Sequence, residues 1–260
     1  MSEAPDQELS MLEGRRVPGT CDWLLKKDVY ISWQDGDLSN LVFWLSGNPG
    51  FGKSVLSSSI INALQEKKFK CSYFFFKRKN QRKQTAADCL LSLVFQMARA
   101  DSSIRRKVLE ADLGTLPDFD GNTLWRKVFL GCIFQALIKE SHYWVIDAVD
   151  ECGESNSLLE MLIDVPPYLK VLFTSRQEPA IETSISRASK KVHHYHIQEG
   201  DTVSDFSKFL DSSMDRVLVS YGAGKDKLKQ RILEKATGSF LWVSLVIKRL
   251  EEAYSEEEAE

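Results

Sequence analysis

The chain has 260 residues, with 34 lysines and arginines against 37 aspartates and glutamates and a formal net charge of −3. Hydrophobic residues make up 43% of it and aromatic residues 10%, which excludes disorder of the whole chain and predicts a full hydrophobic core. The charge balance excludes a strongly basic nucleic-acid-binding protein, and no apolar run approaches the about 18 residues of a transmembrane helix.

The cysteines indicate a reducing, cytoplasmic location. They are odd in number, scattered and without a CxxC pair, which argues against both a disulfide framework and a zinc knuckle. They are Cys21, Cys71, Cys89, Cys132 and Cys152. The first residues also lack the basic and apolar segments of a secretory signal.

Strands and helices are expected to alternate along the chain. Residues 1–13 are expected to be disordered, and 20–34 carries apolar residues at helical spacing. Short apolar runs predict strands at 41–47, 70–77, 143–150, 170–176 and 191–197. Helices are expected between them, including 85–111 as one or two helices and 122–140 as one helix capped by Asn122. This order predicts an α/β fold with a parallel sheet over 14–200, followed by a small helical lobe over 201–254 and an acidic tail over 255–260.

Residues 47–54, GNPGFGKS, match the phosphate-loop pattern GxxxxGK[ST] in full. A strand is expected before the motif and a helix after it, which is the context that a phosphate loop requires. Glycines allow successive backbone N–H groups to face phosphate oxygens, and the helix N-terminus adds partial positive charge. Lys53 is expected to reach the β- and γ-phosphates and Ser54 to bind Mg²⁺. The candidate nucleotide-binding residues here are Gly47, Asn48, Pro49, Gly50, Phe51, Gly52, Lys53, Ser54 and Val55.

Acidic residues follow the third expected strand, in the segment YWVIDAVDE. Asp147 is expected at the carboxyl end of that strand, where open α/β sheets bind ligands, and there it would hold Mg²⁺ directly or through water. Glu151 is the first choice for orienting the attacking water, and Asp150 is the second. The alternative is a strand that simply ends in a solvated acidic turn.

The fourth expected strand ends in Thr174, Ser175 and Arg176. A hydroxyl and a guanidinium at this edge would be placed to sense a γ-phosphate. The alternative is a surface arginine that begins a turn before Pro179.

The ordered set GNPGFGKS, VIDAVDE, LFTSR and GSFLWVSLVIKRL resembles the NACHT NTPases of the STAND class. The segments RRVPGTCDWLL and SYFFFKR resemble the fungal NOD-like receptor and nephrocystin-like branch of these proteins. The likeness covers about 14–250.

The resemblance implies a three-layer α/β/α P-loop NTPase with a five-stranded parallel sheet in the order 5-1-4-3-2. The strand that carries Arg176 would lie between the phosphate-loop strand and the strand of Asp147. Val17, Pro18 and Thr20 would lie near the base and ribose. Many relatives carry a proline that faces the nucleotide from the helical lobe; this sequence has GSFLW there, so that contact is not carried over.

The function that these features imply is a Mg²⁺-dependent signalling switch that binds ATP or GTP and hydrolyses it slowly to ADP or GDP. The nucleotide state would control self-association, as in innate immunity and programmed cell death. The residues expected to act in hydrolysis are Lys53, Asp147, Asp150, Glu151 and Arg176, with Ser54 and Asp147 on the metal.

Two other functions remain open. One is a nucleotide-stabilised protein-interaction module without hydrolysis. The other is a small-molecule kinase, which the adjacent Asp150 and Glu151 disfavour because they suit water as the acceptor. Relatives usually continue into further domains, so an excised NTPase module or a short natural variant is expected.

Two weaker features are interpreted structurally. The basic segment 67–83 surrounds four consecutive aromatic residues that are expected on a buried strand, so no nucleic-acid partner is expected. His193, His194 and His196 are expected on an edge strand and not in a metal site.

Overall fold

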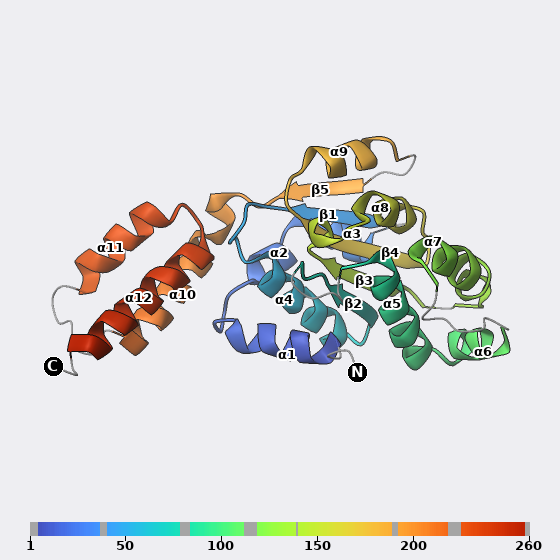
Figure 1. Ribbon diagram of the computed structural model, residues 1–260, viewed down its shortest axis with the longest axis horizontal. Helices are drawn as coiled ribbons and strands as arrows, with labels where there is room; N and C mark the ends of the chain where they lie inside the picture. Colours follow the sequence, from blue (N-terminus) through green and yellow to red (C-terminus); the bar gives the residue numbers. More distant parts are fainter. Residues whose placement is uncertain are drawn as a thin grey trace.

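The structure is a computed structural model that describes residues 5–36, 41–78, 84–111, 119–138, 140–188, 192–217 and 225–257. Its centre is a single sheet of parallel strands, with helices on both faces and three further helices projecting to one side (Figure 1). Among the described residues, none of the helices combines the length and the apolar character needed to cross a bilayer.

The sheet has the strand order β2-β3-β4-β1-β5, which confirms the predicted order 5-1-4-3-2. All neighbouring pairs are parallel, and β4 lies between β1 and β3. The segments that follow β1, β3 and β4 therefore meet at one edge of the sheet. The strands are β1 (Val42–Ser46), β2 (Lys70–Phe75), β3 (His142–Asp147), β4 (Leu169–Ser175) and β5 (Val192–His196).

Alternate residues of each strand enter two separate hydrophobic cores. In β1, for example, Phe43 and Leu45 pack on one face of the sheet while Val42 and Trp44 pack on the other. The first core is covered by α1 (Pro5–Arg15), α2 (Asp22–Leu25), α3 (Asp28–Asp35) and α4 (Lys53–Glu66). The second is covered by α5 (Ala86–Ala100), α6 (Ser102–Glu110), α7 (Gly121–Leu124), α8 (Ser155–Ile163) and α9 (Pro179–Ser186). Because both faces are covered, the strands read as continuous apolar runs.

The last three helices form a lobe with a hydrophobic core of its own. They are α10 (Glu199–Val217), α11 (Lys225–Ala236) and α12 (Phe240–Glu257). Phe206, Leu210, Val243 and Ile247 are buried between them. The lobe touches the rest of the molecule mainly through the first half of α10 and the start of α12, a geometry that shapes the site described below.

The expected disorder of residues 1–13 is wrong for 5–13, which belong to α1. Leu9 and Leu12 are buried against the core that α4 also covers. Glu8 is buried and forms an ion pair with Lys77. Three apolar residues, Leu9, Met11 and Leu12, in a polar segment are too weak a pattern to reveal such a helix.

The C-terminal end of the chain is also more helical than the sequence predicts. Residues 255–257 of the expected acidic tail continue α12 as helix. Residues 258–260, like residues 1–4, lie outside the described part of the chain.

The prediction of a single helix over 122–140 is also wrong. α7 passes into a π-helix, η3 (Trp125–Leu130), and then a 3₁₀ turn, η4 (Ile133–Gln135). The cap is Asp120, whose carboxylate accepts the N–H of Thr123 at 2.8 Å, and not Asn122. The wider turn stacks Trp125 on Phe129, with ring centroids 5.2 Å apart.

The expected burial of the four consecutive aromatic residues is confirmed. Tyr73, Phe74, Phe75 and Phe76 are all buried, while 79–83 of the basic segment lies outside the described part. The five cysteines are free, and burial raises the pKa of the Cys152 thiol to about 11.

On β5, which is an edge strand, His194 stacks on Trp44 with centroids 3.7 Å apart. Its Nε2 and the Nδ1 of His196 lie 2.7 and 2.8 Å from the hydroxyl of Ser46. No group of three or more metal-ligating side chains occurs in the described residues.

A buried histidine predicts how stability depends on pH. His142 is fully buried at the start of β3, with Nε2 2.9 Å from the hydroxyl of Ser72. Burial, assisted by the charge of Lys70, lowers its pKa from 6.5 to about 4. The unfolded chain therefore takes up a proton in this window more readily than the folded chain, and the free energy of unfolding falls as the pH falls from 6.5 towards 4. The expected loss is about 3 kcal/mol.

Urea unfolding at pH 7 and pH 4 measures this loss. His142→Asn keeps a polar partner for Ser72 but removes the titrating group, so its stability is expected to fall less between the two pH values. Equal losses in the two proteins would contradict the assignment.

Candidate nucleotide-binding site

A cavity of about 1130 Å³ lies at the carboxyl ends of the central strands and extends under the lobe. It brings together most of the site residues expected from the sequence. These are Val17, Pro18, Thr20, Pro49, Gly50, Phe51, Gly52, Lys53, Ser54, Val55, Asp147, Asp150, Glu151 and Arg176. Gly47 and Asn48 do not line it, but their carbonyl groups contact Lys53, which does.

The phosphate loop follows β1 and ends within the first two residues of α4. Gly50 and Gly52 have φ values of +82° and +76°, a left-handed conformation that glycine adopts at little cost. Lys53 Nζ donates to the carbonyl oxygens of Gly47 at 2.7 Å and Asn48 at 3.1 Å. Burial lowers the pKa of Lys53, while the charge of Asp147 opposes that shift. The ammonium group is thus held across the mouth of the loop.

Asp147 is 2% exposed, and its carboxylate accepts three hydroxyl hydrogen bonds. Ser54 donates to Oδ2 at 2.6 Å, while Ser57 and Thr174 donate to Oδ1 at 2.9 and 2.6 Å. Burial raises the pKa of Asp147, and the hydroxyl groups act against that rise. The carboxylate is therefore fixed in position by residues of α4 and β4.

Two of these hydroxyls change the expectations from the sequence. Ser57 is not among the site residues expected from the sequence, although its position one helical turn after Ser54 is a usable signal. The Thr174 hydroxyl is placed by the sequence to sense a γ-phosphate, but it donates to Asp147 and accepts the N–H of Ala148, 2.9 Å away.

Ser54 and Asp147 fit a magnesium ion. Their side-chain oxygens lie 2.6 Å apart on the cavity wall, and Mg²⁺ prefers hard oxygen ligands. Magnesium is commonly held by one or two protein groups together with phosphate and water, so a larger cluster of protein ligands is not required.

The turn after β3 directs the acidic residues into the cavity. The strand ends at Asp147, three residues before the expected end at 150, because Ala148 adopts a left-handed conformation with φ 57°. Such a conformation costs energy in a residue other than glycine and is often retained at functional sites. The next three residues form a 3₁₀ turn, η5 (Val149–Glu151).

The two acidic residues of this turn have different partners. Asp150 accepts the backbone N–H of Arg176 at Oδ1 (3.0 Å), and its Oδ2 lies 3.3 Å from Arg176 Nε. Glu151 accepts the backbone N–H of Arg78 at Oε2, 2.7 Å away. Asp150 is thus linked to the end of β4, and Glu151 to the segment after β2.

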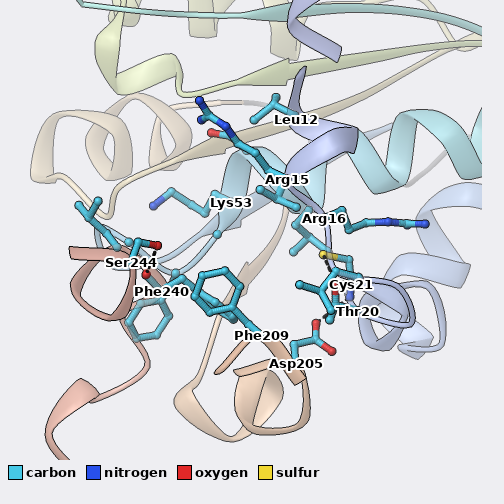
Figure 2. A pocket seen from close by; sticks show the side chains of 18 of the residues that line it. Leu12, Arg15, Arg16, Thr20, Cys21, Lys53, Asp205, Phe209, Phe240 and Ser244 are labelled. Atoms are coloured by element: carbon cyan, nitrogen blue, oxygen red, sulfur yellow. Dashed lines mark hydrogen bonds between the residues drawn. The ribbon is translucent and has the colours of Figure 1, made fainter. Parts of the chain in front are cut away.

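The lobe contributes wall residues that the sequence did not indicate. Figure 2 shows Asp205, Phe209, Phe240 and Ser244 around the cavity, with Thr20 on the wall near Asp205. Phe240 and Ser244 lie within the segment GSFLWVSLVIKRL, which the sequence alone did not connect with the cavity, and no motif marks Asp205 or Phe209.

The start of α12 packs directly on the phosphate loop, although GSFLW lacks the proline of many relatives. The backbone N–H of Phe240 donates to the carbonyl oxygen of Gly50 at 2.9 Å. Gly238 has φ +79°, and a Cβ atom there would lie 3.0 Å from Cζ of Phe51. The loop therefore supports the lobe as well as forming part of the cavity wall.

One protein family and one curated relative match this chain over much of its length. A family model described as "Nephrocystin 3, N-terminal" matches residues 19–176, more than half of the chain. The vegetative incompatibility protein HET-E-1 of Podospora anserina is 27% identical over 246 residues, which is 88% of this chain and 18% of that protein. The chain thus spans less than a fifth of the length of this relative.

The similar solved structures are more distant. AMPPCP-bound DnaA from Aquifex aeolicus has a TM-score of 0.45 and 13% identity, over 95% of this chain and 68% of that one. One chain of a structure of Drosophila ORC bound to AT-rich DNA and Cdc6 has a TM-score of 0.49 and 14% identity, over 95% of this chain and 39% of that one.

The packing of Phe51 on Gly238 predicts the effect of one added methyl group. Gly238→Ala forces alanine into a left-handed conformation and brings its Cβ against the Phe51 ring, so a loss of about 1–2 kcal/mol in unfolding free energy is expected. Gly200→Ala is the matched control, because nothing lies within 4 Å of its added Cβ. Urea unfolding of wild type and both variants tests this expectation. A Gly238→Ala protein as stable as the wild type would refute it.

Proposed function

The chain belongs to the nephrocystin 3 N-terminal family and is a NACHT-like NTPase of the STAND class, and on this premise we propose that it is a Mg²⁺-dependent ATP or GTP switch. It hydrolyses the bound nucleotide slowly, and the nucleotide state controls its self-association. The observation that carries the proposal is the contact between Ser54 and Asp147, 2.6 Å apart on the wall of the cavity. It joins the phosphate-loop helix to the acidic strand end, the two halves of a magnesium-nucleotide site.

The phosphate chain is expected to bind along the loop between β1 and α4. The backbone N–H groups of 50–54 and the N-terminus of α4 stabilise its negative charge. Lys53 exchanges its loop carbonyl partners for phosphate oxygens, which are stronger acceptors because they are charged. Bound Mg²⁺, on Ser54 and Asp147, supplies further neutralisation of the phosphate charge.

Hydrolysis needs a water molecule opposite the leaving group. The water oxygen bonds to the γ-phosphorus, the bond to the bridging oxygen breaks, and the water proton passes to a carboxylate, leaving nucleoside diphosphate and phosphate. Arg176 engages both oxygens of Asp150, whereas the contacts in the described part of the chain use only Oε2 of Glu151. Glu151 therefore suits the role of orienting and deprotonating the water.

Arg176 suits the role of a γ-phosphate sensor. Its guanidinium group is about half exposed, lies beside the cavity and pairs with Asp150. A triphosphate competes with Asp150 for this cation, and the exchange would reposition the turn between β3 and α8. Such an exchange would distinguish triphosphate from diphosphate.

A second candidate is a module that keeps nucleotide for structural reasons and does not hydrolyse it. The observation that favours it is the packing of Gly238 and Phe240 on the phosphate loop, which makes the loop part of the lobe contact. Nucleotide extracted from the untreated, purified protein separates the two functions. Diphosphate supports the switch, and intact triphosphate without turnover supports the structural module.

Lys53→Ala is expected to reduce nucleotide affinity by at least about a hundredfold, since it removes a cation that contacts the phosphates. Titration calorimetry with Mg²⁺ and ATP or GTP measures the affinity. Lys107→Ala, on the exposed surface of α6, is the control and should bind as the wild type does. An unchanged affinity of Lys53→Ala would overturn the site.

Glu151→Gln is expected to retain triphosphate binding and to slow turnover by about a hundredfold, the usual contribution of a general base. Asp150→Asn weakens the pairing with Arg176 and is expected to slow turnover less. Phosphate release under single-turnover conditions compares the two variants. A larger loss in Asp150→Asn would exchange the roles of the two residues.

A further inference from the structure

We propose that one face of α10, formed by Asp201, Asp205 and Lys208, positions the segment 19–27 and thereby the nucleoside end of the bound nucleotide. Asp205 is then a positioning residue for the nucleoside and not for the phosphates. The inference rests on the proposed nucleotide site and adds to it a part of the lobe that sets affinity.

Three contacts tie α10 to this segment. Asp205 Oδ2 accepts the backbone N–H of Cys21 at 2.7 Å. Lys208 Nζ donates to the carbonyl oxygen of Gly19 at 2.6 Å, and Asp201 pairs with Lys27 at 2.8 Å. The spacing of four and three residues places all three side chains on one face of the helix. We call this set of contacts the α10 clasp.

The segment needs such support because its backbone is unusual. Cys21 has φ 71° and Gly19 has φ 74°, two left-handed residues separated only by Thr20. For cysteine this conformation is unfavourable and persists where surrounding contacts impose it. The Cys21 N–H is held by a carboxylate that is only 8% exposed, so water competes little for this bond.

The clasp lies at the part of the cavity where the resemblance places the base and ribose. Thr20 and Cys21 line the cavity, and so does Asp205 itself. Figure 2 shows Asp205 directed at Thr20 and Cys21, away from Lys53. The phosphate end of the cavity is built by a different support, the loop between β1 and α4.

Because different elements support the nucleoside end and the phosphate end, loss of the clasp should affect the binding of only some ligands. Loss of the Asp205 contact should loosen the wall around the nucleoside and leave the phosphate loop intact. Affinity for a nucleotide should then fall, while affinity for pyrophosphate, which has no base or ribose, should not. A variant that is merely unstable would lose both.

Titration calorimetry with Mg²⁺ and ADP, GDP or pyrophosphate on the full chain tests this signature. Asp205→Ala is expected to bind the preferred diphosphate about tenfold more weakly and pyrophosphate unchanged. Asp205→Asn keeps an oxygen acceptor for Cys21 and should recover most of the affinity. Asp211→Ala is the matched control, because Asp211 lies on the same helix but pairs with Lys229. Parallel losses for nucleotide and pyrophosphate in Asp205→Ala, or no loss for either, would overturn the proposal.

Hydrogen exchange without nucleotide tests the clasp independently of binding. The amides of 19–25 are expected to exchange faster in Asp205→Ala than in wild type or Asp211→Ala. If the wild type binds neither diphosphate nor pyrophosphate, the proposed function fails, and the exchange result still decides whether α10 holds this segment. Unchanged exchange in Asp205→Ala would refute the clasp.

Discussion

The buried carboxylate of Asp147 is the point on which the site depends. A carboxylate that is 2% exposed is costly unless it is hydrogen-bonded, and here Ser54, Ser57 and Thr174 supply three hydroxyl donors. These donors come from α4 and from β4, so one side chain of β3 links three elements. The phosphate loop, the acidic turn and the end of the neighbouring strand thereby keep a common geometry.

The parallel strands and their order explain how a few residues that are far apart in the chain form one site. β4 lies between β1 and β3, so the segments after these strands reach the same edge although they are far apart in the chain. The acidic turn is directed inward by the left-handed conformation of Ala148, and Asp150 then meets Arg176 at the end of β4. The chemistry of the site is therefore a consequence of sheet topology together with one strained residue.

Patterns that depend on neighbouring residues were readable from the sequence. Each of these patterns lies within about ten residues: the apolar runs of the strands, the phosphate-loop pattern and the acidic turn. The order of the motifs supported the family resemblance, and the resemblance predicted the sheet topology. Features that depend on distant partners were not readable. α1 is held by the burial of Leu9 and Leu12, and the π-helix by ring stacking around Trp125. Asp205 is far in sequence from Cys21, its partner, and no local pattern predicts their contact.

The contact of Phe51 with Gly238 has a consequence for the exchange of parts between related proteins. Phe51 occupies a position of the phosphate loop that the motif leaves open, yet a Cβ atom at 238 would lie only 3.0 Å from its ring. The variable residues of the loop are thus constrained by the lobe and not only by phosphate. Chimaeras that graft a foreign lobe onto this sheet would have to transfer 48–51 and 237–241 together, as one compatible unit.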